Sequence, residues 1–139
     1  MSKKPYILIA DDDQEDRFLL DIAFKEIGSL EHLCMVENGI QVIDHLNEIA
    51  DNTGLPALIV LDLNMPILGG IDTLEKLKST DRFKDIPVII HSTSMYEAEK
   101  ERCLQIGAVD FIKKPVSFDQ MISTAKFLNE FSVVALKME

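Results

Sequence analysis

Short runs of apolar residues alternate along this chain with longer segments in which apolar side chains recur every three or four positions. The short runs are rich in Val, Ile and Leu, which is typical of strands buried on both faces of a sheet. They cover residues 6–10, 31–36, 57–61, 88–91 and 109–112. The run at 31–36 is a weaker strand candidate than the others.

The longer segments have the periodicity of amphipathic helices. We expect helices at residues 14–27, 40–49, 71–79, 95–106 and 118–131. In the first of them, Phe18, Leu19, Ile22, Ala23 and Ile27 should share the buried face. The fourth is heavily charged and has only a thin apolar stripe, so we expect it to dock weakly and to shift at low energetic cost.

Strands and helices in strict alternation predict an α/β fold, in which a parallel sheet carries helices on both faces. The crossovers should be right-handed. Periodicity alone does not give the strand order. Of the two common doubly wound orders, the five-stranded one is 2-1-3-4-5, and it would place the carboxyl ends of the first and third strands side by side.

The chain has 139 residues, which predicts one domain with its core at residues 6–131 and an apolar C-terminal tail at 132–139. We expect no membrane span, because no apolar stretch is long enough. A net charge of −10 argues against direct binding to nucleic acid. Cys34 and Cys103 match no metal-binding spacing, and no export signal is evident, so the expected compartment is the cytoplasm.

Chemistry enters at the ends of the apolar runs, where four of the predicted strands stop at polar residues. These are Asp11-Asp12-Asp13, Asp62 with Asn64 close behind, Ser92-Thr93, and Lys113-Lys114. The acids and the hydroxyls have an ordinary alternative, because an Asp or Ser there can cap the next helix or start a turn. Three acids in succession are more than one cap needs, however, and ligands of open α/β sheets bind at this edge.

In the 2-1-3-4-5 order, Asp11, Asp12 and Asp62 would meet in one pocket, with Ser92 and Lys114 beside them. At an effective dielectric constant of about 20, each close pair of carboxylates repels by roughly 3–4 kcal/mol, so the three need cations nearby. Oxygen ligands of this kind suit Mg²⁺. A carboxylate beside Mg²⁺ can act as a nucleophile, and a lysine can bind phosphate as a point charge. The set therefore indicates phosphoryl transfer onto Asp62.

The same residues resemble the receiver domain of bacterial two-component response regulators, a CheY-like, flavodoxin-like fold. The resemblance extends over residues 6–131. It is carried by Ala10-Asp11-Asp12-Asp13, by Leu61-Asp62-Leu63-Asn64-Met65-Pro66 with Gly69-Gly70, by Ser92-Thr93, and by Phe111-Ile112-Lys113-Lys114-Pro115. Each motif is weak alone, but four in the right order, each at a strand end, are specific.

The resemblance implies a role for each matching residue. Asp62 would accept the phosphoryl group, and Mg²⁺ would be held by Asp12, by Asp11 mostly through water, and by the backbone carbonyl of Asn64. Lys114 would bind the phosphoryl oxygens, and Ser92, followed by Thr93, would be the switch hydroxyl. Phe111 would be the aromatic that swings inward with it. The Lys114–Pro115 peptide bond would be cis.

The resemblance also implies partners. A sensor histidine kinase would donate the phosphoryl group from a phosphohistidine, and the chain would act as a signalling protein rather than as an enzyme. With no output domain expected after the last helix, it would control a downstream protein or relay the phosphate to a histidine phosphotransfer protein. It looks like the stand-alone receivers that serve phytochrome-type kinases. Apolar residues at 131–136 suggest a homodimer.

Three alternatives remain open. A haloacid dehalogenase-type phosphohydrolase would need a second Asp two residues after its nucleophile, and Asn64 stands there. A phosphorylation-independent interaction module on the same fold would tolerate loss of the acids, the hydroxyl or the lysine, all of which are retained. A flavodoxin-like cofactor binder would need a Ser/Thr/Gly-rich phosphate loop after the first strand, where the chain has acids.

Overall fold

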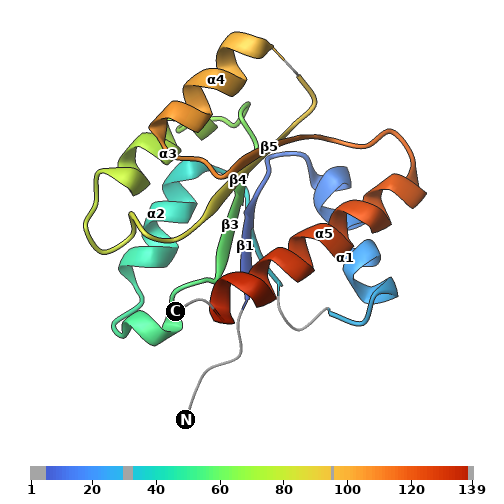
Figure 1. The fold of residues 1–139 in the computed structure, drawn as a ribbon, viewed down its shortest axis with the longest axis horizontal. Helices are drawn as coiled ribbons and strands as arrows, with labels where there is room; N and C mark the ends of the chain where they lie inside the picture. The colour runs from blue at the N-terminus through green and yellow to red at the C-terminus, as the bar shows by residue number, and fades with distance from the viewer. Residues whose placement is uncertain (1–5, 30–32, 95, 138–139) are drawn as a thin grey trace.

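The computed structural model describes residues 6–29, 33–94 and 96–137, with side chains described through Val134. One parallel sheet of five strands forms its centre, in the order β2-β1-β3-β4-β5, and helices cover both faces (Figure 1). The predicted fold class and strand order are confirmed. The strands are β1 (Ile7–Ala10), β2 (Leu33–Val36), β3 (Leu58–Leu61), β4 (Val88–Ser92) and β5 (Asp110–Lys113). The helices are α1 (Gln14–Glu26), α2 (Gly39–Asn47), the short 3₁₀ helix η2 (Asn52–Gly54), α3 (Gly70–Lys78), α4 (Glu97–Ile106) and α5 (Phe118–Lys137).

The register of the sheet brings the polar strand ends together. Ala10 of β1 pairs with Leu61 of β3, so the acids that follow these two strands emerge side by side. The backbone N–H of Asp62 donates to the carbonyl of Ala10 at 3.0 Å. On the other side, the N–H of Lys114 donates to the carbonyl of Ser92 at 2.7 Å, which joins the ends of β5 and β4.

Each face of the sheet has its own hydrophobic core. On one face, residues such as Ile7, Ile9 and Ile89 pack against α1 and α5. On the other, residues such as Leu8 and Ile90 pack against α2, α3 and α4. The alternation of strand side chains between the two faces explains why the strands read as continuous apolar runs in the sequence.

Helix α1 buries only part of the stripe that we expected: Ala23 is buried and Leu19 and Ile27 pack against the core, but Phe18 does not. Leu20, Ala23 and Phe24 are buried, whereas Phe18 is 61% exposed, so its assignment to the core was wrong. Leu20 and Phe24 lie one helical turn apart and present the two largest apolar side chains to the sheet. With that orientation fixed, Phe18 lies about 160° around the helix from Leu20 and faces outward.

Two predicted boundaries fall partly outside the described residues. The predicted starts of the strand at 31–36 and of the helix at 95–106 lie there, and the described elements begin at Leu33 and Glu97. At the other end of the chain, α5 continues to Lys137, so most of the apolar tail at 132–139 is helical. None of the described helices is long and apolar enough to cross a membrane.

Candidate functional site

The acids at the ends of β1 and β3 form one cluster. Asp11 and Asp62 are 2% and 5% exposed, and Asp12 is open to solvent. One carboxylate oxygen from each of the three lies within 4.8 Å of the others. Such a cluster of oxygen donors, part buried and part open, is what a divalent cation with retained water ligands requires.

The third acid of the triplet has a separate task. Asp13 is the N-cap of α1, and its Oδ1 accepts hydrogen bonds from the N–H groups of Glu15 at 2.9 Å and Asp16 at 3.2 Å. The N–H of Asp13 in turn donates to Oδ1 of Asp11 at 3.0 Å. Asp13 alone caps the helix, so Asp11 and Asp12 are free to join the cluster. The triplet thus combines a helix cap with part of a cation site.

Lys114 lies over the buried acids from the end of β5. Its Nζ is 2.8 Å from Oδ2 of Asp11, 3.0 Å from Oδ2 of Asp62 and 2.9 Å from Oδ2 of Asp16, and its side chain is 6% exposed. Burial by itself would lower the pKa of Lys114, but the hydrogen bonds to Asp11 and Asp16 outweigh it and raise that pKa above the ordinary value. Lys114 therefore stays a cation.

For Asp11, burial changes the pKa more than its hydrogen bonds do. It raises the pKa of Asp11 to about 6, although hydrogen bonds from Lys114 and from the N–H of Asp13 oppose the rise. The nearby charge of Asp62 adds to it. Because the charged form of Asp11 is poorly solvated at this position, a bound cation would stabilise it.

The loop after Asp62 brings α3 close to the acid. The N–H of Asn64 faces Oδ1 of Asp62 at 3.4 Å, and Asn64 itself is exposed. A side chain at Gly70, the first residue of α3, would clash with the backbone carbonyl of Asp62. Glycine at this position is therefore what allows the helix to start against the strand end.

The predicted switch residues differ in their exposure. Ser92 is fully buried at the end of β4, and its Oγ lies 3.3 Å from the Oγ of Ser94, whereas Thr93 faces solvent. Phe111 is 4% exposed and belongs to the core under α2, α3 and α4. The aromatic side chain thus already occupies an inward position.

The prediction of a cis bond before Pro115 was wrong, since no peptide bond among the described residues is cis. A trans bond before proline is favoured by about 0.5–1 kcal/mol unless the surrounding turn reverses that preference. Here the N–H of Val116 still finds an acceptor, Oε1 of Gln120 at 3.2 Å, with the bond in the trans form.

Two residues at this edge escaped the sequence-based prediction. Asp16 contacts Lys114, and Arg17 donates from Nη1 to the backbone carbonyl of Asp11 at 2.6 Å. The only sequence signal for Asp16 was its spacing of about one helical turn from Asp12. That spacing fits equally well a first helical turn whose acids face solvent.

His91 is 2% exposed, and its Nε2 has no hydrogen-bond partner within the part of the chain that the structure describes. Burial, with Lys114 nearby, lowers the pKa of His91 to about 4.

Comparison with known proteins agrees with this geometry. The family model of the response regulator receiver domain matches residues 7–126. The chain is 30% identical over 109 residues to the chemotaxis protein CheY1 of Helicobacter pylori, which covers 78% of this chain and 84% of that protein. The phosphorylated cyanobacterial phytochrome response regulator RcpA superposes with a TM-score of 0.83 at 26% identity, covering 94% of this chain and 95% of that one. Response regulator RPA3017, from red light signaling of R. palustris, gives 0.80 at 28% identity over 92% and 93%.

Proposed function

This chain belongs to the response regulator receiver domain family, and from that premise we propose that Asp62 accepts a phosphoryl group from the phosphohistidine of a sensor histidine kinase. The observation that carries the proposal is the buried Asp62 carboxylate beside the Lys114 ammonium, at the edge where the other acids meet. We propose that residues 1–139 form one receiver domain, with its core at residues 6–131 and a C-terminal tail at 132–139.

The chemistry is a transfer between two nucleophiles. An oxygen of Asp62 forms a bond to phosphorus while the P–N bond of the phosphohistidine breaks. The electron pair of that bond stays on the donor imidazole, which then takes up a proton. Lys114, 3.0 Å from Oδ2 of Asp62, is placed to stabilise negative charge that gathers on the phosphoryl oxygens during transfer.

The acidic cluster fits Mg²⁺ by the chemistry and spacing of its donors. Asp11, Asp12 and Asp62 would hold the ion, together with the backbone carbonyl of Asn64. When bound, Mg²⁺ would offset the mutual repulsion of the acids and the charge of the incoming phosphoryl group. One lysine is a smaller positive charge than three carboxylates and a phosphoryl group require.

Phosphorylation would then be read out through β4, β5 and the helices beside them. The buried Ser92 hydroxyl and Lys114 stand on neighbouring strand ends that a backbone hydrogen bond joins. A phosphoryl group with about two negative charges would favour the arrangement in which both bind it, shifting a two-state equilibrium. We expect α4, β5 and α5 to form the surface that changes and that a downstream protein or a histidine phosphotransfer protein recognises.

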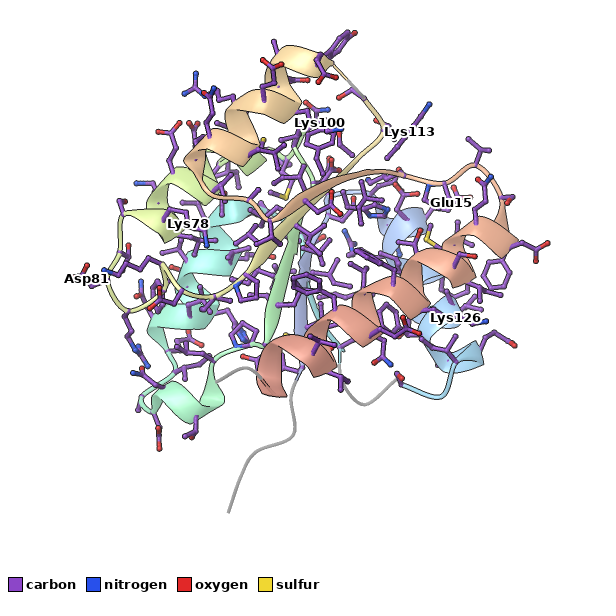
Figure 2. All side chains as sticks on the ribbon, viewed as in Figure 1. Glu15, Lys78, Asp81, Lys100, Lys113 and Lys126 are labelled. Atoms are coloured by element: carbon purple, nitrogen blue, oxygen red, sulfur yellow. The ribbon has the colours of Figure 1, made fainter. Side chains whose placement is uncertain are left out.

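Phosphate uptake tests the proposal directly. The protein would be incubated with a small-molecule phosphodonor and Mg²⁺, and its intact mass measured. We expect one added phosphoryl group, lost on chelation of Mg²⁺ and in Asp62→Asn. Lys114→Met should slow uptake, whereas its neighbour Lys113, which points away from the sheet edge (Figure 2), provides the matched control Lys113→Met with normal uptake.

The result that would contradict the proposal is a folded protein that takes up no phosphate from the small donor or from a purified histidine kinase. That outcome would support the phosphorylation-independent interaction module instead. Uptake at a residue other than Asp62, seen as an unchanged mass gain in Asp62→Asn, would also contradict it.

A further inference from the structure

Asp16 stands where a helix-capping acid is expected, but it does not cap. It is the third residue after the N-cap Asp13, the position from which an acid can accept the N–H of the cap residue. That N–H is taken by Oδ1 of Asp11 at 3.0 Å. The Asp16 carboxylate extends instead to Lys114, 98 residues away in the sequence, with Oδ2 2.9 Å from Nζ.

Three carboxylates already surround the ammonium group of Lys114. An ammonium group has three N–H donors. Nζ of Lys114 donates hydrogen bonds to Oδ2 of Asp16 and Oδ2 of Asp62, and it forms an ion pair with Oδ2 of Asp11 at 2.8 Å. A phosphoryl group on Asp62 can therefore be bound by Lys114 only if one of these carboxylates gives up its contact.

Asp16 is the partner that costs least to release. Its side chain is 26% exposed, against 2% for Asp11 and 8% for Asp62, so water can solvate it once it leaves Lys114. It is also absent from the cluster of carboxylate oxygens that fits a cation. Its effect on Lys114 can thus be separated from the binding of Mg²⁺.

We propose that Asp16 is a positioning residue that competes with the phosphoryl group for Lys114 and so favours the unphosphorylated state. The proposal rests on the function argued above. In the unphosphorylated protein, Asp16 helps to hold the ammonium over the acids. On phosphorylation, Lys114 exchanges Asp16 for a phosphoryl oxygen, and the strength of the Asp16 contact subtracts from the stability of the phosphorylated state.

The test is the affinity of Asp16→Asn for beryllofluoride, a mimic of the phosphoryl group, in saturating Mg²⁺. Loss of a charge-assisted contact that is made only in the unphosphorylated state should tighten beryllofluoride binding by roughly three- to ten-fold. The same variant, free of ligand, should melt at a lower temperature, and its aspartyl phosphate should last longer by a similar factor. A residue with a merely structural role would lower both stability and affinity.

Glu15 supplies the matched control, because it is an exposed acid in the same turn of α1 (Figure 2). Glu15→Gln removes the same charge without touching Lys114, so it should leave beryllofluoride affinity within about two-fold of wild type. In a Lys114→Met background, Asp16→Asn should no longer tighten beryllofluoride binding, because the ammonium group for which Asp16 and the phosphoryl group compete is gone.

Two results would contradict the inference in different ways. Wild type that binds beryllofluoride, with Asp16→Asn binding equally or more weakly, would remove the role of Asp16 and leave the proposed function intact. Wild type that neither binds beryllofluoride nor takes up phosphate would contradict the proposed function, and the inference with it.

Discussion

The two helices that flank β5, α4 and α5, are held to the sheet very differently. Helix α5 buries Met121, Ala125, Leu128 and Ser132, spread over three of its turns. Helix α4 buries only Cys103. Its N-cap residue, Tyr96, makes no side-chain capping bond, and its clearest polar tie is the solvent-exposed ion pair between Arg102 and Glu75 of α3 at 2.8 Å.

This difference indicates which of the two helices can move when the proposed phosphorylation site changes. A helix with one buried side chain can shift at low cost, whereas a helix with several anchored turns stays with the sheet. The thin apolar stripe that its charged sequence predicted for α4 is confirmed by its burial, and it supports the expectation of weak docking. We therefore expect the change at Ser92 and Lys114 to move α4 more than α5.

The largest expected effect lies in the anchoring of α5. Leu128 is fully buried, so Leu128→Ala should lower the free energy of unfolding by about 2–5 kcal/mol, from lost apolar burial and a residual cavity. Cys103→Ala, the corresponding truncation in α4, should cost only about 1 kcal/mol, because less volume is removed. Urea unfolding of both variants measures the difference. Equal losses would contradict the expectation that the buried side chain of α4 contributes less to stability than Leu128 of α5.

The second effect is a pH dependence of the folding stability, and it comes from His91 on the sheet face that α1 and α5 cover. His91 alternates with Ile89, which packs in the core under α1 and α5, so His91 points to the same face. Its pKa is lowered to about 4, while the unfolded chain has the ordinary value of 6.5. Between these values the unfolded state binds more protons, so stability is present above pH 6.5 and is lost as the pH falls toward 4.

The loss should approach roughly 1.4 kcal/mol per pH unit in the middle of that window and be on the order of 2–3 kcal/mol in total by pH 4. Asp11, whose raised pKa acts with the opposite sign, is unchanged in the comparison of wild type with His91→Gln. Unfolding free energies of the two proteins from pH 7.5 to pH 4 should therefore diverge as the pH falls. Parallel curves would show that His91 does not titrate differently in the folded protein.

The strands and helices could be predicted from local pattern, and the strand order from the small number of common doubly wound orders. Apolar runs fix the strands, and polar residues at their ends must meet once the strand order is chosen from the common ones. Asp11, Asp12 and Asp62 do meet. The residue roles and the Mg²⁺ site are proposals that the phosphate-uptake experiment tests.

What the sequence did not predict depends on contacts between distant elements. Phe18 and Phe24 both fit a helical stripe, and only packing against the sheet selects Phe24. The contact between Asp16 and Lys114 joins the first turn of α1 to the end of β5, and no periodicity relates those segments. The isomer of the bond before Pro115 was inferred from the family alone, and the described bond is trans.

The smallest effect has the opposite sign and is the sharpest test of α4. Glu99 lies in the first turn of α4, and its Oε1 is buried without a hydrogen-bond partner among the described residues. A buried acceptor left without a partner is unfavourable, so Glu99→Met should stabilise the docked helix. The same change also removes a favourable charge near the helix N-terminus, and the exposed acid Glu97 in that turn measures this second contribution through Glu97→Met.

Relative to Glu97→Met, Glu99→Met should raise the free energy of unfolding by about 0.5–1 kcal/mol. It should also slow hydrogen exchange of the α4 amides while leaving α5 unchanged, because the gain belongs to the docked position of α4 alone. If beryllofluoride binding changes the exchange of the α4 amides less in Glu99→Met than in wild type, then weak docking of α4 is required for its response to phosphorylation. Exchange that stays as fast as in wild type would show that the unpaired acceptor is not what loosens α4, and the contrast with α5 would then rest on the number of buried side chains.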